Sequence, residues 1–124
     1  MEKVYYFKFA VAYADTDAEG VMYHARYIEV AERARSDFSR HIAIPDGDIG
    51  FVAREVNIKY IHPLHLNDEF VVESRTVKIG GASMVIEQKF VKDDKICAIM
   101  NITIAYLGSD MRPKAIPESI IDML

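Results

Sequence analysis

The sequence predicts an α+β domain in which a curved antiparallel sheet of five strands wraps around one central helix. Three observations support this prediction. One helical segment with an apolar face occupies about residues 23–38, strand-like segments lie on both sides of it, and the strands after it are joined largely by short turns. Short connections favour antiparallel pairing, and long twisted strands curl around a helix that must bury its apolar face. An open α+β sandwich would use the same elements.

Length and composition predict a single domain that covers residues 1–124, with an ordinary balance of 51% hydrophobic and 27% charged residues. The net charge is −4, with acids and bases mixed along the chain, which argues against a nucleic-acid partner. The one cysteine, Cys97, excludes an intramolecular disulfide and fits a reducing compartment. We find neither a signal-peptide pattern nor an apolar run of roughly 20 residues, so we expect a cytoplasmic protein without a membrane span.

The first predicted strand covers residues 3–12, and turn-forming residues follow at 15–20. Apolar residues then recur at spacings of three and four and define one face of the helix: Tyr23, Tyr27, Val30, Ala31, Ala34 and Phe38. The two alanines keep this face slim, so a sheet can approach closely. On the other side, charged residues have the spacing of i,i+4 ion pairs: Glu29, Arg33 and Asp37. A loop over 41–50 ends the helix.

The remaining chain is predicted to be mostly strand. We expect strands over residues 51–61, 70–79, 83–92 and 96–107, and a final helical turn within 118–124. The connections are a segment fixed by Pro63, a bend at Gly80-Gly81, and a hairpin turn over 92–95. One helix and five strands in this order are best packed as the hotdog fold, in which the curved sheet encloses the helix.

The segment from Tyr13 to Tyr27 carries the most informative motif. It reads Asp-Thr-Asp, two residues, Gly-Val-x-Tyr-His-x-x-Tyr, and Glu-Arg-Ala-Arg follows at 32–35. This pattern resembles the acyl-CoA thioesterases of the hotdog superfamily, in the 4-hydroxybenzoyl-CoA thioesterase group and nearest the YbgC-type enzymes. The resemblance continues through most of the chain, including residues 51–54, the segment from Pro63 to Asp68, and residues 113–117.

The resemblance implies a homo-oligomer, commonly a tetramer built as a dimer of dimers, with active sites at subunit interfaces. The substrate would be an acyl-CoA thioester, and coenzyme A would enter as part of that substrate rather than as a cofactor. The second Asp of the family motif is catalytic, which implies that role for Asp17. The family's helix start offers a backbone N–H to the thioester carbonyl, and this position falls on His24, with Tyr23 just before it.

The chemistry of Asp17 leaves two routes open. A carboxylate can attack the thioester carbon to give a mixed anhydride, or it can deprotonate a water molecule that attacks. The amino end of a helix carries unpaired N–H groups and partial positive charge, which suit the oxyanion; one such donor is typically worth ~3 kcal/mol in the barrier. The His24 ring either orients Asp17 or the acyl group, or packs locally. Tyr23 fits a pocket wall better than a catalyst.

Two other acidic residues near the motif are read as structural. Asp15 is expected to bond the turn or an N–H at the helix end. Glu32 is spaced to pair with Arg35 at i,i+3. Other hotdog enzymes place a catalytic Glu on this helix, so Glu32 is the second candidate for the base. Asp17 itself has a structural alternative, because Asp commonly caps turns of this kind.

Binding of the coenzyme A phosphates requires cations or free backbone N–H groups. Relatives often place basic residues at the bend between the third and fourth strands, whereas residues 79–83 carry no charge here. The cationic candidates nearby are Arg54, Lys78, Arg112 and Lys114, of which Lys114 has the best motif support. Each is also readable as an ordinary surface cation. Gly80 and Gly81 are the alternative, since they allow backbone N–H groups to approach the nucleotide.

No metal site is predicted. His62 and His65 lie three residues apart on either side of Pro63, which makes a poor ligand pair, and no cysteine pair exists. Cys97 lies within a strand and is read as an inert core thiol. Two rival functions use the same fold: hydrolysis of acyl groups from acyl carrier protein, and a non-catalytic subunit that binds an acyl ligand or a partner protein. The intact Asp17 motif argues against the second rival.

Overall fold

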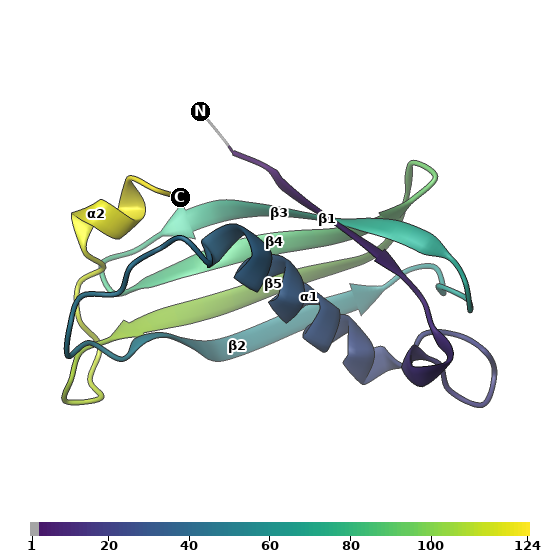
Figure 1. The fold of residues 1–124 in the computed structure, drawn as a ribbon, viewed down its shortest axis with the longest axis horizontal. Coiled ribbons are helices and arrows are strands. Elements are labelled where there is room, and N and C mark those ends of the chain that lie inside the picture. The colour runs from purple at the N-terminus through teal and green to yellow at the C-terminus, as the bar shows by residue number, and fades with distance from the viewer. Residues whose placement is uncertain (1–2) are drawn as a thin grey trace.

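The computed structural model, which describes residues 3–124, confirms the predicted α+β architecture (Figure 1). Its elements in chain order are β1 (Tyr5–Ala10), a 3-10 turn η1 (Tyr13–Asp15), α1 (His24–Ser39), β2 (Gly50–Tyr60), β3 (Glu69–Ile79), β4 (Ser83–Lys92), β5 (Lys95–Leu107) and α2 (Glu118–Ile121). Most predicted boundaries agree to within one residue. The first strand is shorter than expected, because the chain leaves the sheet to form η1.

All five strands are antiparallel and follow the order β1-β3-β4-β5-β2. The consecutive strands β3, β4 and β5 form the middle of the sheet, and the two strands from the N-terminal half flank it. β1 is therefore one edge and β2 the other. The ladder between β2 and β5 shifts register between Ala53 and Glu55, so β2 carries a bulge at Arg54.

The helix α1 crosses the concave face of the sheet, as Figure 1 shows. Its buried residues are Tyr27, Val30, Ala31 and Ala34. Ala31 has no exposed surface, which confirms that small residues bring the helix close to the sheet. Tyr23, which the periodicity placed on the apolar face, is 46% exposed instead. The physical reason is that Tyr23 is the N-cap with extended backbone, so it lies before the helical repeat begins.

A buried amide joins the helix to the centre of the sheet. Gln88 on β4 is fully buried, and its Nε2 donates to the Ala31 carbonyl at 2.9 Å and to Ser74 Oγ at 3.0 Å. Its Oε1 accepts a hydrogen bond from Arg35 Nη1 at 2.9 Å. Arg35 therefore bonds to the sheet, and the charge of Glu32 at i,i+3 acts on it without a close ion pair among the contacts within residues 3–124. Burial lowers the pKa of Arg35.

The ion pairs on α1 also differ from the predicted i,i+4 series. Among residues 3–124 the pairs on this helix are Arg26 with Glu29 and Arg40 with Asp37, both at i,i+3. Arg26 also contacts Asp15 and Ala14 in the turn before the helix. No helix in the described part of the chain is long and apolar enough to cross a membrane.

Ala31→Leu tests the close seating of the helix. The larger side chain has no space between α1 and the sheet, so we expect the free energy of unfolding to fall by about 1–3 kcal/mol in urea denaturation. Arg33→Leu places the same side chain on the exposed side of α1 and should change stability by less than about 0.5 kcal/mol. Equal stabilities for the two variants would show that the seating is loose.

Candidate functional site

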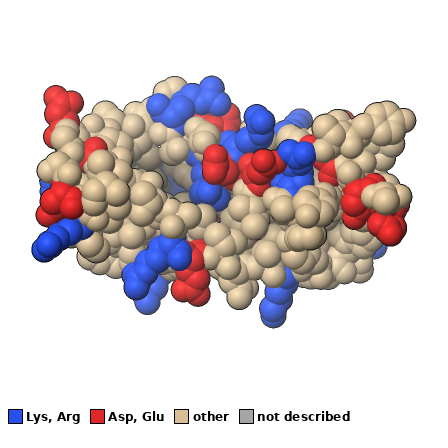
Figure 2. Space-filling model, turned by 90° about the horizontal axis from the view of Figure 1, so that it is seen from below, with Lys and Arg blue, Asp and Glu red and all other residues tan. Residues whose placement is uncertain are grey.

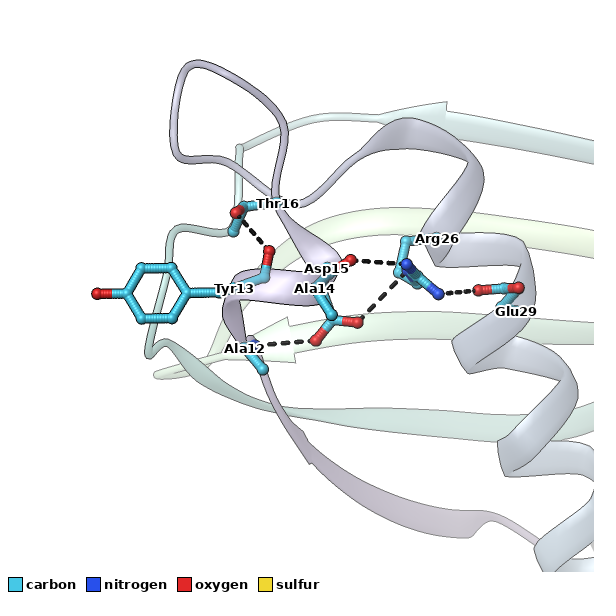
Figure 3. A network of polar contacts seen from close by, with 7 residues as sticks. All are labelled: Ala12, Tyr13, Ala14, Asp15, Thr16, Arg26 and Glu29. Carbon is cyan, nitrogen blue, oxygen red and sulfur yellow. Dashed lines mark hydrogen bonds and ion pairs between the residues drawn. The ribbon is translucent and has the colours of Figure 1, made fainter.

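The turn before α1 is tied to the helix by a network of polar contacts centred on Asp15 and Arg26 (Figure 3). The buried Asp15 carboxylate accepts a hydrogen bond from the Ala12 N–H at 2.8 Å and lies 3.4 Å from Arg26 Nε. Arg26 also donates from Nη2 to the Ala14 carbonyl at 2.6 Å, and its Nη1 bonds Glu29. Asp15 thus bonds the turn, as expected, and fixes the end of β1 against the start of α1.

Asp17 begins the tight loop that follows this tie. Thr16 and Met22 form an isolated antiparallel bridge, which closes the loop beside the start of α1. Gly20 has a φ of +79°, a conformation that favours glycine, and its N–H donates to the Asp17 carbonyl at 3.1 Å. Asp17 is half-buried, and its Oδ1 accepts the Glu19 N–H at 2.9 Å. Within residues 3–124, its Oδ2 has no hydrogen-bond partner.

The helix start beside this loop presents free backbone donors. Tyr23 makes no side-chain cap, and its own N–H donates to the Asp15 carbonyl at 2.8 Å. The Arg26 N–H donates back to the Tyr23 carbonyl at 2.8 Å. In the described part of the chain, the N–H groups of His24 and Ala25 donate to no acceptor. Two donors with the positive end of the helix dipole are therefore available to an anion or a polarised carbonyl.

The side chains of Tyr23 and His24 lie on the surface and contact each other, with ring centroids 4.4 Å apart. This contact is the local packing that is one of the two alternatives for the His24 ring. The His24 carbonyl accepts a hydrogen bond of 2.7 Å from the hydroxyl of Tyr60, the last residue of β2. Sequence patterns gave no sign of this bond, because its partners are 36 residues apart and meet only through the fold.

The connection between β2 and β3 is joined to the Asp17 loop by backbone hydrogen bonds. The Met22 N–H donates to the Leu64 carbonyl at 2.6 Å, and the Leu66 N–H donates to the Gly20 carbonyl at 3.1 Å. Asp68 holds this connection: its carboxylate accepts the His65 N–H and Lys92 Nζ, and these bonds lower its pKa. No group of three or more His, Cys, Asp or Glu side chains within 3–124 is arranged to hold a metal ion.

Of the residues predicted to bind substrate, Gly80, Gly81 and Lys114 lie at the other end of the sheet from Asp17, and Arg54 and Lys78 lie nearer its middle. Ser83 pairs with Ala105 and Ala105 with Val52, which places the bend at Gly80-Gly81 at the beginning of β2. Tyr60, bonded to the helix start, marks its far end. A strand of 11 residues, as β2 is, spans roughly 35 Å at about 3.3 Å per residue. Within one chain, the two predicted halves of the site are therefore far apart.

One of those predicted ligands, Lys114, already has partners in the structure. Lys114 Nζ lies 2.9 Å and 3.1 Å from the two carboxylate oxygens of Asp48, and the hydroxyl of the buried Tyr106 donates to the same carboxylate at 2.7 Å. These two hydrogen bonds lower the pKa of Asp48. Burial, followed by the contact with Asp48, raises the pKa of Tyr106 to about 12. Lys114 thus joins β5, the loop before β2 and the C-terminal segment.

The remaining candidates for substrate binding differ in whether other groups of the chain already contact them. The Gly80 N–H donates to the Ser83 carbonyl at 2.7 Å, so it closes the bend, whereas a Cβ added at Gly81 would meet no atom within 4 Å. Lys78 and Arg54 are exposed, and Arg54 occupies the bulge of the edge strand β2. Lys78, Arg54 and the likewise exposed Arg112 are therefore cations that a ligand could approach without breaking a side-chain contact within residues 3–124.

A largely apolar cavity of about 390 Å³ opens between the C-terminal half of α1 and the sheet. Arg35 lines it on the helix side, and Phe51 and Ala53 line it at the beginning of β2. It lies at the opposite end of α1 from Asp17. No local sequence pattern indicates this cavity, because its walls come from α1, the loop after it, three strands and Leu124.

Comparison with known proteins gives a consistent result. A sequence profile described as the Thioesterase-like superfamily matches residues 11–124. The chain is 32% identical over 120 residues to the acyl-CoA thioester hydrolase YbgC of Escherichia coli O6:H1, covering 90% of this chain and 88% of the relative. It is similar to a crystal structure of a probable thioesterase from Bartonella henselae, with a TM-score of 0.80, 30% identity and coverage of 92% and 98%. A thioesterase from Thermus thermophilus, complexed with coenzyme A and Zn, has a TM-score of 0.86 and 27% identity, with coverage of 96% and 90%.

Asp15→Ala and Asp17→Ala separate the two aspartates of the motif. Loss of the buried Asp15 carboxylate leaves the Ala12 N–H and Arg26 without their partner, so we expect the free energy of unfolding to fall by about 1–3 kcal/mol. Asp17→Ala removes one exposed bond within its own loop and should cost less than about 1 kcal/mol. Urea unfolding measures both, and a larger loss for Asp17→Ala would contradict these roles.

Proposed function

Since the chain belongs to the thioesterase-like superfamily, we propose that it hydrolyses acyl-CoA thioesters, giving a carboxylic acid and free coenzyme A. The observation that carries this proposal is the position of Asp17 in the loop that leads into the uncapped start of α1. One carboxylate oxygen of Asp17 has no partner within 3–124, and two backbone N–H groups of α1 beside it are free donors. A carboxylate next to preorganised donors is what attack on a thioester carbonyl requires.

In the proposed reaction the thioester oxygen accepts hydrogen bonds from the free N–H groups of His24 and Ala25, which stabilise the negative charge that develops on it. Asp17 then takes a proton from a water molecule that attacks the carbonyl carbon, or attacks that carbon itself and forms an anhydride that water cleaves. In both routes the C–S bond breaks, the thiolate leaves and is protonated to the free thiol. A thiolate leaves readily, so a single carboxylate suffices. Neither route uses a metal or a cofactor.

We further propose that the working form is a homo-oligomer in which two chains pair through the β2 edges. Val56 on this strand is 38% exposed, and Val52 and Tyr60 are exposed apolar neighbours. Figure 2, which views the molecule from the β2 side, shows mixed charges in a band and uncharged side chains over much of the remaining face. An unpaired strand edge with apolar side chains is a template for pairing with another strand.

Antiparallel pairing of two β2 strands would also complete the site. The Tyr60 end of one copy would meet the Gly50 end of the other, which brings Asp17 toward the partner's bend at Gly80-Gly81, its Lys78 and the apolar cavity. The acyl group and the phosphates would then bind residues of the second copy. Two such dimers would form the tetramer implied by the resemblance. We also propose a cytoplasmic location, which the free thiol of Cys97 supports.

Asp17→Asn tests the catalytic role. The amide can neither accept the proton nor act as a nucleophile, so we expect kcat on acyl-CoA to fall roughly 10²–10⁴-fold while the unfolding midpoint stays unchanged. Release of free thiol from a panel of short, long and aromatic acyl-CoA substrates is the measurement. A variant with wild-type rates would remove Asp17 from the mechanism, and a wild-type protein inactive on every substrate would refute the activity.

Val56→Arg tests the pairing through β2. A charge placed on this edge should prevent two β2 strands from pairing, so sedimentation should show a smaller species with little thioesterase activity although Asp17 is intact. Val4→Arg is the matched control, because Val4 is 36% exposed and precedes the strand at the opposite edge of the sheet. Full activity in a monomeric Val56→Arg protein would show that one chain holds a complete site.

A further inference from the structure

We propose that Tyr60 is a positioning residue of this site, which holds and polarises the first peptide unit of α1 through its hydroxyl. The proposal rests on the thioesterase function inferred above. Tyr60 belongs to none of the motifs of the N-terminal segment. It ends β2, 36 residues after His24, yet its hydroxyl donates to the His24 carbonyl oxygen at 2.7 Å.

The Tyr60 ring is held in place by contact with one aromatic side chain, which itself packs against another. It meets the ring of Tyr27 edge-on, with centroids 5.0 Å apart and an interplanar angle of 83°. Tyr27 is buried and in turn packs against Phe90 of β4 at 5.2 Å. Edge-to-face contacts of this kind fix the orientation of a ring. The Tyr60 hydroxyl is therefore a donor at a defined position rather than at the end of a mobile side chain.

The bond to Tyr60 acts on one of the two free donors of the helix start. The carbonyl of His24 and the N–H of Ala25 belong to the same planar, trans peptide unit, so fixing the carbonyl on one side aims the N–H on the other. A hydrogen bond to the carbonyl oxygen also draws electron density from the nitrogen. Hydrogen bonds linked in this way strengthen one another by roughly 10–30%. The Ala25 N–H is thereby made a better and more rigid donor.

Apart from the bonds of Tyr23 and Arg26 to the turn before α1, the helix start lacks the restraint of a side-chain cap. Tyr23 provides no side-chain cap, so the bonds that a Ser or Asp would supply at this position are missing. Partial burial raises the pKa of Tyr60, so its hydroxyl remains protonated and able to donate at neutral pH. Tyr60 thus restrains the helix start through the His24 carbonyl, as a capping side chain would through the N–H groups. The N–H groups of His24 and Ala25 therefore stay free for a substrate. A conventional N-cap side chain would accept from the N–H of Ala25 or Arg26 and so would compete for one of the two free donors.

Tyr60→Phe removes the hydroxyl and keeps the ring contact with Tyr27. We expect kcat on the best acyl-CoA substrate to fall roughly fivefold, with KM and the unfolding midpoint unchanged, because the lost bond acts mainly on the oxyanion. Tyr13→Phe is the matched control, since the Tyr13 side chain is 82% exposed and lies outside the proposed machinery. It should retain wild-type kcat and KM.

A spectroscopic measurement distinguishes polarisation from simple support of the fold. An acyl-CoA labelled with ¹³C at the thioester carbonyl is bound to Asp17→Asn, which should hydrolyse it slowly, and the infrared carbonyl stretch is recorded. Adding Tyr60→Phe should move this stretch to higher frequency, since the donors weaken. Only folded, ligand-bound protein contributes this signal, so a loss of stability would not mimic it.

The possible outcomes separate this proposal from the function on which it depends. If the wild-type protein releases no thiol from any acyl-CoA, both proposals fail. If the wild type is active and Tyr60→Phe matches Tyr13→Phe in kcat and leaves the carbonyl stretch in place, the role of Tyr60 is wrong and the function stands. A rise in KM at constant kcat would likewise overturn it, because that result describes substrate binding.

Discussion

The close seating of α1 on the concave face of the sheet is the constraint on which the rest of the structure depends. Ala31 and Ala34 allow the helix backbone to approach the strands, and the Gln88 amide reaches the Ala31 carbonyl as a result. Because helix and sheet are locked together, the first turn of α1 has a fixed place at one end of the sheet. The open donors at His24 and Ala25 can therefore be aimed without a capping side chain.

The two aspartates of the motif have different surroundings at that helix start. Asp15 is buried and bonded to Arg26, so it has no free role in chemistry, while the neighbouring loop presents an oxygen of Asp17 without a partner among residues 3–124. The tie through Arg26 and the support from the β2–β3 connection make this loop part of the rigid frame. The apolar cavity lies at the opposite end of α1 from this loop, so the length of the helix separates the two within one chain.

Periodicity and turn chemistry predicted nearly all of the fold, since the helix face and the short turns are local properties of the sequence. The motif likewise predicted where Asp17 lies. The contacts of Tyr60 with His24, Arg35 with Gln88, and Lys114 with Asp48 could not be predicted, because each joins residues distant along the chain whose meeting depends on strand register. The exposure of Tyr23 was missed for a different reason: periodicity does not show where a helix begins.

The strand order has a consequence for the way the chain folds as it is synthesised. β3, β4 and β5 pair with their sequence neighbours, and the β4–β5 turn needs only Asp93 and Asp94, both at positive φ. β1 and β2 leave the ribosome first but pair with β3 and β5, so each must wait for a distant partner. Such long-range pairing is slow and leaves apolar strands exposed in the meantime. The half of the chain that carries Asp17 therefore becomes native only after the last strand has been made.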